Sequence, residues 1–149
     1  MKSLSGKVAL ITGGGTGLGR EIALQLADEG MQIAVNYSRS QSAAEQTIAD
    51  LGELGVKATG HMADLASTEA AITLVDEVIA EYGRLDLLIH NAGVLRFDGL
   101  DTLEADHLRL QFEANALAPL LLFVGEPVVG PRSLLDPSGS TPSVGTALH

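Results

Sequence analysis

Short apolar runs alternate along this chain with segments whose apolar side chains recur at helical spacing. Residues 7–12 (KVALIT) form a continuous apolar run that stops at a cluster of glycines, which is typical of a strand buried on both faces of a parallel sheet. Leu18, Ile22 and Leu26 then lie on one face of an amphipathic segment that ends at Gly30, as a helix with a glycine cap does. The first unit is therefore predicted to be strand, glycine turn and helix.

The same order then repeats. Residues 32–36 are predicted to form a strand, and Ser42 with Glu45 three residues later matches the capping box that opens a helix. That helix is expected to close near Gly55, and residues 56–62 are predicted to form a third, weaker strand. The chain thus continues the alternation of its first unit.

A third helix is predicted between Ser67 and Gly83, a fourth strand at residues 85–89, and one more helix at residues 103–117. Strands that alternate with helices of this length imply right-handed crossovers and a parallel, doubly wound sheet. The predicted fold class is therefore α/β, a Rossmann-like doubly wound parallel sheet that is incomplete, with about four strands and flanking helices.

The pattern changes after Ala118, because all five prolines of the chain lie beyond it. Residues 1–118 are predicted to form one folded domain, and residues 119–149 an irregular or disordered tail rich in Pro, Gly and Ser. For residues 120–124 the apolar pattern leaves two interpretations open, the end of the preceding helix or a short strand.

The composition narrows the classes of partner. A net charge of −10 argues against attraction to nucleic acid or to an anionic membrane. No apolar run approaches the roughly 18 residues of a membrane span, and the start of the chain lacks the apolar core of a signal peptide. The chain contains no cysteine, and its four histidines show no metal-ligand spacing. We therefore expect a cytoplasmic protein without a metal site.

The glycine cluster after the first strand carries the clearest chemistry. Residues 12–19 read TGGGTGLG and give the spacing G-x-x-x-G-x-G. Glycines between a buried strand and a helix allow a tight turn, a close approach of the backbone to a pyrophosphate, and helix N–H groups aimed at its charge. We expect this turn to bind a dinucleotide; a glycine turn without a ligand is the alternative.

The glycine spacing, preceded by Thr12, resembles the cofactor signature of the short-chain dehydrogenase/reductase family. The sequence HNAG at residues 90–93 resembles the Asn-Asn-Ala-Gly motif of that family, with His90 in place of the first Asn. Small residues at the carboxyl end of a strand let the ribose and nicotinamide pass close to the backbone. A loop turn without a ligand is the alternative for residues 91–93.

Two further positions fall in the order that this family shows, and the resemblance covers roughly residues 4–120. Asp64 and Leu65 resemble the pair that contacts the adenine ring, although an Asp before a helix also serves as an N-cap. Asn115 resembles the active-site asparagine of the family, and without the resemblance it is a polar residue in an apolar helix. The resemblance implies that residues 1–118 are an NAD(P)-binding domain.

The end of the second strand bears on the choice of cofactor. Residues 36–39 (NYSR) contain no carboxylate to bind a ribose 2′-hydroxyl, and Arg39 with Ser38 could hold a 2′-phosphate. NADP(H) is therefore favoured over NAD(H), while Thr16 stands where NADP(H)-preferring members often carry a basic residue. A solvated surface arginine is the alternative for Arg39. The expected cofactor contacts are Gly13, Gly15, Thr16, Gly17, Leu18, Gly19, Arg39, Asp64, Leu65, Asn91, Ala92 and Gly93.

In the family that this chain resembles, a hydride passes between the nicotinamide and a carbonyl, and a Tyr followed four residues later by Lys supplies the proton. This chain has only Tyr37 and Tyr82, and its last lysine is Lys57, so it contains no Tyr-x-x-x-Lys. The resemblance, closest to 3-oxoacyl-[acyl-carrier-protein] reductases, implies an NADP(H)-dependent oxidoreductase that acts on a small carbonyl or acyl substrate and often assembles as a homo-oligomer.

Three hypotheses therefore stand beside one another: an active oxidoreductase of that family, a nucleotide-binding pseudoenzyme, and a truncated product without a stable function. Catalysis by this chain is disfavoured, because only Asn115 of the family's catalytic group is present. The sequence after about Ala118 is interpreted as a frame change or an alternative end. The substrate is left open, because the residues that shape its pocket in the family are missing.

Overall fold

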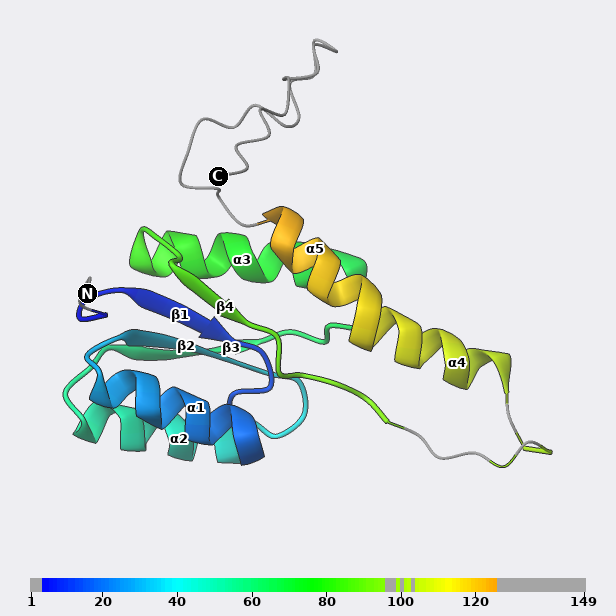
Figure 1. Cartoon of the computed structure of the whole chain (residues 1–149), viewed down its shortest axis with the longest axis horizontal. Coiled ribbons are helices and arrows are strands. Elements are labelled where there is room, and N and C mark those ends of the chain that lie inside the picture. The colour runs from blue at the N-terminus through cyan, green and yellow to red at the C-terminus, as the bar shows by residue number, and fades with distance from the viewer. Residues whose placement is uncertain (1–3, 96–98, 100, 103, 126–149) are drawn as a thin grey trace, which may run out of the picture.

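The computed structural model of this protein describes residues 4–95, 99, 101, 102 and 104–125. Strands alternate with helices, and a longer helical stretch follows the fourth strand (Figure 1). In chain order the elements are β1 (Val8–Ile11), α1 (Gly17–Asp28), β2 (Gln32–Tyr37), α2 (Gln41–Glu53), β3 (Ala58–Met62), α3 (Thr68–Tyr82), β4 (Leu87–Ile89), α4 (Ala105–Phe112), the π-helix η1 (Glu113–Leu117) and α5 (Ala118–Gly125). The strands and helices predicted before residue 90 are all confirmed.

The strands form one parallel sheet in the order β3-β2-β1-β4. β1 lies in the middle, and its Ala9 is paired with Ile33 on one side and with Leu87 on the other. In the described part of the chain, β4 pairs only with β1. Helices connect parallel strands, so the carboxyl ends of all the strands lie at one edge of the sheet. The predicted α/β class, an incomplete Rossmann-like sheet, is confirmed.

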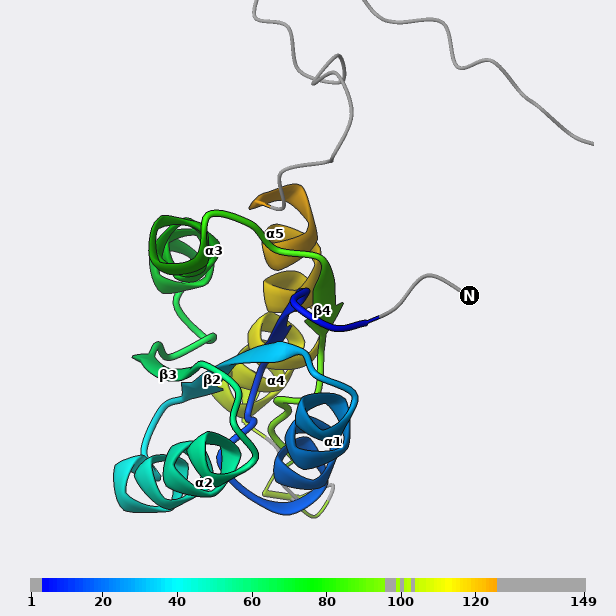
Figure 2. The same ribbon diagram turned by 90° about the vertical axis from the view of Figure 1, so that its left-hand side faces the viewer.

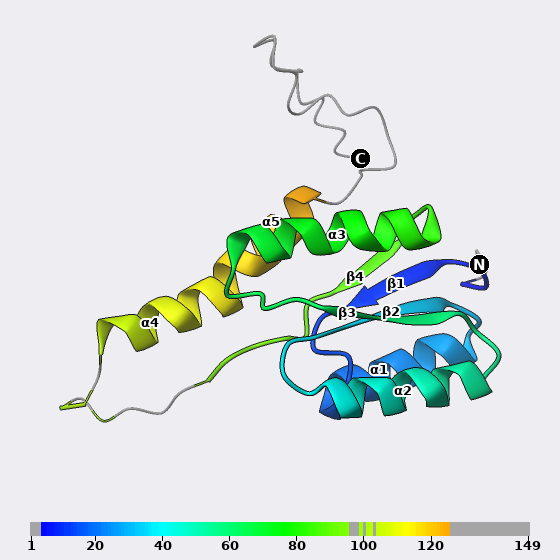
Figure 3. The same ribbon diagram turned by 180° about the vertical axis from the view of Figure 1, so that it is seen from behind.

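Helices cover both faces of the sheet and make a molecule of three layers (Figures 2 and 3). Side chains of β1 alternate between the two faces. Val8 and Leu10 pack in a cluster with α3 and α5, whereas Ala9 and Ile11 pack in a cluster with α1 and α2. All four are fully buried, which explains why the sequence of β1 is apolar without interruption.

The capping box predicted at the start of the second helix is wrong. α2 begins at Gln41, so Ser40 is its N-cap and Ser42 lies inside the first turn. Glu45 accepts a hydrogen bond of 2.8 Å from the Gln41 side chain instead of reaching back to the backbone of Ser42. The capping box requires its serine at the N-cap, where the backbone is not yet helical, and Ser42 lies two residues after the N-cap.

The helical stretch after residue 104 is longer than predicted, because it continues through Pro119 to Gly125. The irregular structure expected directly after Ala118 is therefore wrong for residues 119–125, and the open question of residues 120–124 is decided in favour of helix. In η1 the Ala118 N–H bonds to the Glu113 carbonyl, five residues back. This widened turn gives room for the proline ring, which clashes with the carbonyl four residues back in an ordinary α-helix.

Two sequence predictions fall on other parts of the chain. The start of the last helix at Leu103 and the tail at residues 126–149 lie outside the described residues, so the division of the chain into two parts near residue 118 stays a prediction. Among the described residues, no helix combines the length and the apolar character needed to cross a bilayer. The expected cytoplasmic location also stays a prediction.

Candidate functional site

Three turns meet at the carboxyl edge of the sheet, namely the glycine turn between β1 and α1, the turn between β2 and α2, and the segment after β4. They enclose a pocket of about 270 Å³. Its lining residues are Gly13, Gly15, Thr16, Tyr37, Ser38, Arg39, Ser40, Asn91, Ala92 and Gly93. Seven of the residues that the sequence predicts as cofactor contacts are thus brought together around one hollow.

Two further pockets continue along the same edge. One of about 100 Å³ shares Gly13 and Gly93 with the first pocket and adds Asp64 and Leu65. The other, of about 440 Å³, lies between Arg39, Asp64 and residues further along the chain. An elongated ligand can therefore lie across the carboxyl ends of several strands, which is where open α/β sheets bind ligands.

The glycine turn presents free backbone donors at the start of α1. Thr16 is the N-cap of α1, but its side chain makes no capping hydrogen bond. Within the described residues, no acceptor is bonded to the N–H groups of Gly17, Leu18 or Gly19. Gly17 has a positive φ of 53°, and this conformation turns the chain into the helix. Uncapped N–H groups and the helix dipole together favour an anion at this point.

Close packing requires a glycine at position 19. A Cβ at this position would lie 2.5 Å from the Asn91 side-chain nitrogen and would collide with the Gly13 carbonyl. Gly19 therefore allows the first turn of α1 to lie directly against the glycine turn and the end of β4. Leu18, by contrast, is 70% exposed at the mouth of the turn.

Hydrogen bonds of the Thr12 and Asn91 side chains connect the end of β1 with the end of β4. The Thr12 hydroxyl accepts hydrogen bonds of 3.0 Å from the N–H groups of Asn91 and Ala92. The Asn91 amide group donates in return to the carbonyls of Thr12 and Gly13, at 3.0 and 3.2 Å. Asn91 thus shapes the glycine turn from the neighbouring strand, and its role is partly structural.

Sequence reasoning missed the two buried polar side chains that lie behind this turn, Asn36 and Thr47. Asn36 is 2% exposed and Thr47 is fully buried. Asn36 entered the sequence argument only as a position without a carboxylate. Thr47 carried a usable signal, because it lies on the apolar face of α2 between Ala44 and Leu51 at helical spacing. A hydroxyl on such a face needs a buried partner.

Arg39 lies at the turn after β2 and lines two of the three pockets. Its side chain is exposed, and it forms no ion pair or hydrogen bond with any described residue. Ser38 lines the same pockets beside it. The guanidinium is therefore available to a ligand at the edge of the pocket.

Asp64 and Leu65 follow β3 and differ in their surroundings: Asp64 closes a local turn, whereas Leu65 belongs to the core. The Asp64 carboxylate accepts a hydrogen bond of 3.0 Å from the Ala66 N–H and closes a local turn. The N-cap of α3 is Ser67, so the alternative of Asp64 as a helix cap is wrong. Leu65 is 9% exposed and belongs to the core under α3, and it also lines the pocket of about 100 Å³.

Asn115 lies in the π-helix and holds the segment after β4. Its side-chain oxygen accepts from the Val94 N–H and its nitrogen donates to the Val94 carbonyl, both at 2.7 Å. A Cβ at Gly93 would lie 3.2 Å from the Asn115 oxygen, so the backbone passes close to this side chain. At the end of β4, partial burial lowers the pKa of His90, which favours its neutral ring.

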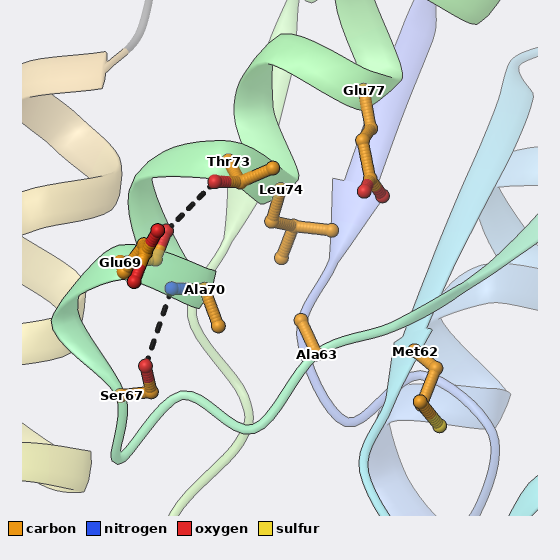
Figure 4. A pocket seen from close by; sticks show the side chains of 8 residues that line it. All are labelled: Met62, Ala63, Ser67, Glu69, Ala70, Thr73, Leu74 and Glu77. Carbon is orange, nitrogen blue, oxygen red and sulfur yellow. Dashed lines mark hydrogen bonds between the residues drawn. The ribbon is translucent and has the colours of Figure 1, made fainter.

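A further pocket of about 320 Å³ lies between the end of β3 and α3 and shares Ala63 with the pocket of about 100 Å³ (Figure 4). Figure 4 shows the Ser67 side chain bonded to the Ala70 N–H and the Thr73 hydroxyl bonded to the Glu69 carbonyl. The hydroxyl groups of Ser67 and Thr73 thus form hydrogen bonds with the backbone of α3 itself. Within the described ranges, no group of three or more His, Asp or Glu side chains is placed to hold a metal ion.

Comparison with known proteins shows to which family this arrangement belongs. The family model for short chain dehydrogenases matches residues 7–124. The 3-oxoacyl-[acyl-carrier-protein] reductase FabG of Staphylococcus aureus is 41% identical over 90 residues, which are 60% of this chain and 37% of that protein. The short-chain dehydrogenase/reductase homolog YusS of Bacillus subtilis is 39% identical over 99 residues, which are 66% of this chain and 91% of that protein.

Among solved structures, a short chain dehydrogenase from Burkholderia cenocepacia in complex with NADP superposes with a TM-score of 0.81 at 35% identity, over 83% of this chain and 51% of that one. The chain spans less than half the length of the first curated relatives that it matches, 49% and 44%. The family match covers the strands, the glycine turn and the helices up to α5 that carry the pocket. This chain therefore belongs to the short chain dehydrogenase family.

Proposed function

We propose that this chain binds a nicotinamide dinucleotide across the carboxyl edge of its sheet, with NADP(H) preferred over NAD(H). One observation carries the proposal. The uncapped start of α1, the close backbone of residues 91–93 and Arg39, which pairs with no described residue, all meet at one pocket. The relative from Burkholderia cenocepacia, which has the same fold over 83% of this chain, is described in complex with NADP.

Each part of the pocket matches one part of such a ligand. The N–H groups of Gly17 and Leu18 suit the negatively charged pyrophosphate. Asp64 lines the two pockets next to Arg39 and suits the adenosine end. Asn91 and Gly93 leave space for the ribose and the nicotinamide beside the end of β4.

The preference for a 2′-phosphate rests on charge. Because the chain carries a net charge of −10, an exposed phosphate needs a local cation to hold it. Arg39 supplies that cation with a fork of donors that fits a phosphate, and no carboxylate among residues 36–39 repels it. NADH lacks the 2′-phosphate and gains little from this arginine.

A bound nicotinamide exchanges a hydride with a carbonyl substrate, and this step needs a proton donor beside the substrate. The residue four positions after Tyr37 is Gln41, and the one four positions after Tyr82 is Asp86, so neither tyrosine has a lysine partner. The Tyr82 hydroxyl donates to the Ile33 carbonyl at the opposite end of β2, and burial raises the pKa of Tyr82. We therefore propose that these 149 residues bind the cofactor without turnover.

A fluorescence titration of the purified chain with NADPH and NADH tests this proposal. Replacement of Arg39 (Arg39→Met) is expected to weaken NADPH binding about tenfold, the loss of roughly 1.4 kcal/mol, and to leave NADH binding unchanged. Lys7→Met removes the same charge before β1, at the opposite edge of the sheet, and is expected to bind NADPH like the wild type.

Three results would contradict parts of the proposal. Failure to bind either cofactor contradicts dinucleotide binding as a whole and favours the hypothesis of a product without stable function. Equal affinities of wild type and Arg39→Met for NADPH contradict the role of Arg39. Oxidation of NADPH by these residues with a 3-oxoacyl thioester or a ketone, followed at the nicotinamide absorbance, contradicts binding without turnover.

A further inference from the structure

Asn36 joins two turns that are far apart in the sequence. Its side-chain oxygen accepts from the Gly13 N–H at 3.3 Å, in the glycine turn. Its side-chain nitrogen donates to the carbonyls of His61 and Ala63, both at 3.2 Å, where β3 leads into the turn of Asp64. One buried amide thus connects the backbone at the pyrophosphate end of the proposed site with the backbone at its adenosine end.

Only an amide satisfies this set of partners. The two carbonyls need a donor and the Gly13 N–H needs an acceptor, and the Asn36 side chain offers both at one position. An Asp of the same size has no donor when ionised, so its carboxylate would face the carbonyl of Ala63. An apolar side chain would offer no hydrogen bond to the Gly13 N–H or to the Ala63 carbonyl.

Thr47 holds the other side of the same turn. Its hydroxyl donates to the Gly15 carbonyl at 2.9 Å, and both groups are buried. The contact is close, because a Cβ at Gly15 would lie only 2.9 Å from the Cβ of Ala44. α2 therefore packs on the glycine turn, and its Thr47 directs the Gly15 carbonyl away from the pocket. Arg39 lies just before the start of α2.

We propose that Asn36 and Thr47 are positioning residues that hold the glycine turn in its binding shape before a dinucleotide arrives. Thr47 lines none of the three pockets, and Asn36, although it lines the pocket of about 100 Å³, is only 2% exposed. Both side chains act through the backbone of Gly13 and Gly15. A turn rich in glycine has large conformational freedom, so fixing it in advance lowers the entropy lost on binding. This inference rests on the proposed dinucleotide site and explains how a flexible turn provides it.

Thr47→Val tests the inference with the least change of shape, because it replaces the hydroxyl by a methyl group. NADPH and NADH are both expected to bind about tenfold more weakly, a change of about 1.4 kcal/mol, and Thr47→Ser is expected to restore wild-type affinity. Asn36→Asp is expected to have the same effect on both cofactors. Thr59→Val is the matched control, because the Thr59 hydroxyl bonds to Tyr82 and His61 and not to the glycine turn.

Amide hydrogen exchange of the ligand-free protein supplies a readout that a merely structural role would not move. In Thr47→Val the hydrogen-bonded amides of the turn, residues 12–14, are expected to exchange about tenfold faster than in the wild type, whereas amides in the middle of α3 keep their protection. Thr59→Val is expected to lower the melting temperature without this local effect. Unchanged exchange of residues 12–14 in both Thr47→Val and Asn36→Asp would overturn the inference.

The two readouts separate this inference from the proposed function. If the wild type binds neither cofactor, the proposed function fails, and the hydrogen exchange of residues 12–14 still decides whether Asn36 and Thr47 fix the turn. If the wild type binds NADPH and Thr47→Val binds it equally tightly, the positioning role fails and the proposed function stands. If Thr47→Val binds the cofactors more weakly and Thr47→Ser binds them like the wild type, both the proposed function and the positioning role are supported.

Discussion

At the scale of single residues, Asp86 joins the starts of β1 and β4. Its carboxylate accepts a hydrogen bond of 2.9 Å from the Val8 N–H and bonds to the Arg84 guanidinium. The side chain is only 13% exposed. The hydrogen bond from Arg84, together with that from Val8, holds the pKa of Asp86 below its usual value. The carboxylate therefore stabilises the folded state only while it is ionised.

Asp86→Asn is expected to lower the free energy of unfolding at pH 7 by about 1–2 kcal/mol, because the charged hydrogen bonds are lost. Since the pKa is lower in the folded than in the unfolded state, this difference is present above the unfolded value near 3.8 and disappears as the pH falls through the folded value. Urea denaturation of wild type and variant between pH 7 and pH 3 measures it.

The matched control is Asp106→Asn, whose side chain is 86% exposed in α4. It is expected to change the free energy of unfolding by less than about 0.5 kcal/mol at every pH. A difference between wild type and Asp86→Asn that is as large at pH 3 as at pH 7 would contradict the assignment.

At the scale of elements, the two helices that begin with serine differ in how they begin. In α3 the Ser67 hydroxyl accepts from the Ala70 N–H at 3.4 Å, and the helix ends at Gly83 with a φ of 76°. In α2 the N-cap is Ser40, whose side chain makes no capping bond, and Ser42 is exposed inside the helix. The sequence predicts a capping box at Ser42 and, without naming a cap, a helix between Ser67 and Gly83.

Ser67→Ala is therefore expected to lower the free energy of unfolding by about 1 kcal/mol, the usual effect of a lost serine cap. Ser42→Ala is expected to be neutral or slightly stabilising, because alanine is favoured inside a helix. Urea denaturation followed by circular dichroism compares the two variants. A loss of stability in Ser42→Ala equal to that in Ser67→Ala would mean that α2 begins at Ser42 in solution.

At the scale of the whole molecule, the proposed ligand would bridge elements that pack on opposite faces of the sheet. α1 and α2 cover one face, and α3 and α5 cover the other (Figures 2 and 3). The proposed site spans turns that lead into α1, α2 and α3, so a bound dinucleotide would connect both layers at the carboxyl edge. Binding to the folded state alone stabilises the molecule by mass action.

NADPH at about one hundred times its dissociation constant is expected to add about 2.7 kcal/mol to the free energy of unfolding and to raise the melting temperature by several degrees. NADH at the same concentration is expected to give a smaller shift, because it lacks the 2′-phosphate that we propose Arg39 binds. Thermal unfolding followed by circular dichroism measures both shifts. Equal shifts with the two cofactors would argue against the preference for NADP(H).

The sequence by itself determined the order of strands and helices and the position of the glycine turn. Apolar runs and helical periodicity depend on neighbours within one or two turns of chain, so they can be read without knowing the fold. The sequence also placed Arg39 near residues 91–93, because the carboxyl ends of parallel strands must meet at one edge of the sheet. These positions could be placed together before any contact between them was known.

Only the tertiary structure decided which polar side chains shape the site. Asn36 reaches Gly13 and Ala63, and Thr47 reaches Gly15, across 23 to 32 positions of sequence, so strand order and helix packing create these bonds. Likewise, the continuation of the helix through Pro119 depends on a widened turn that no local propensity indicates. The chain pattern specified where a dinucleotide could lie, and long-range packing fixed the backbone that would hold it.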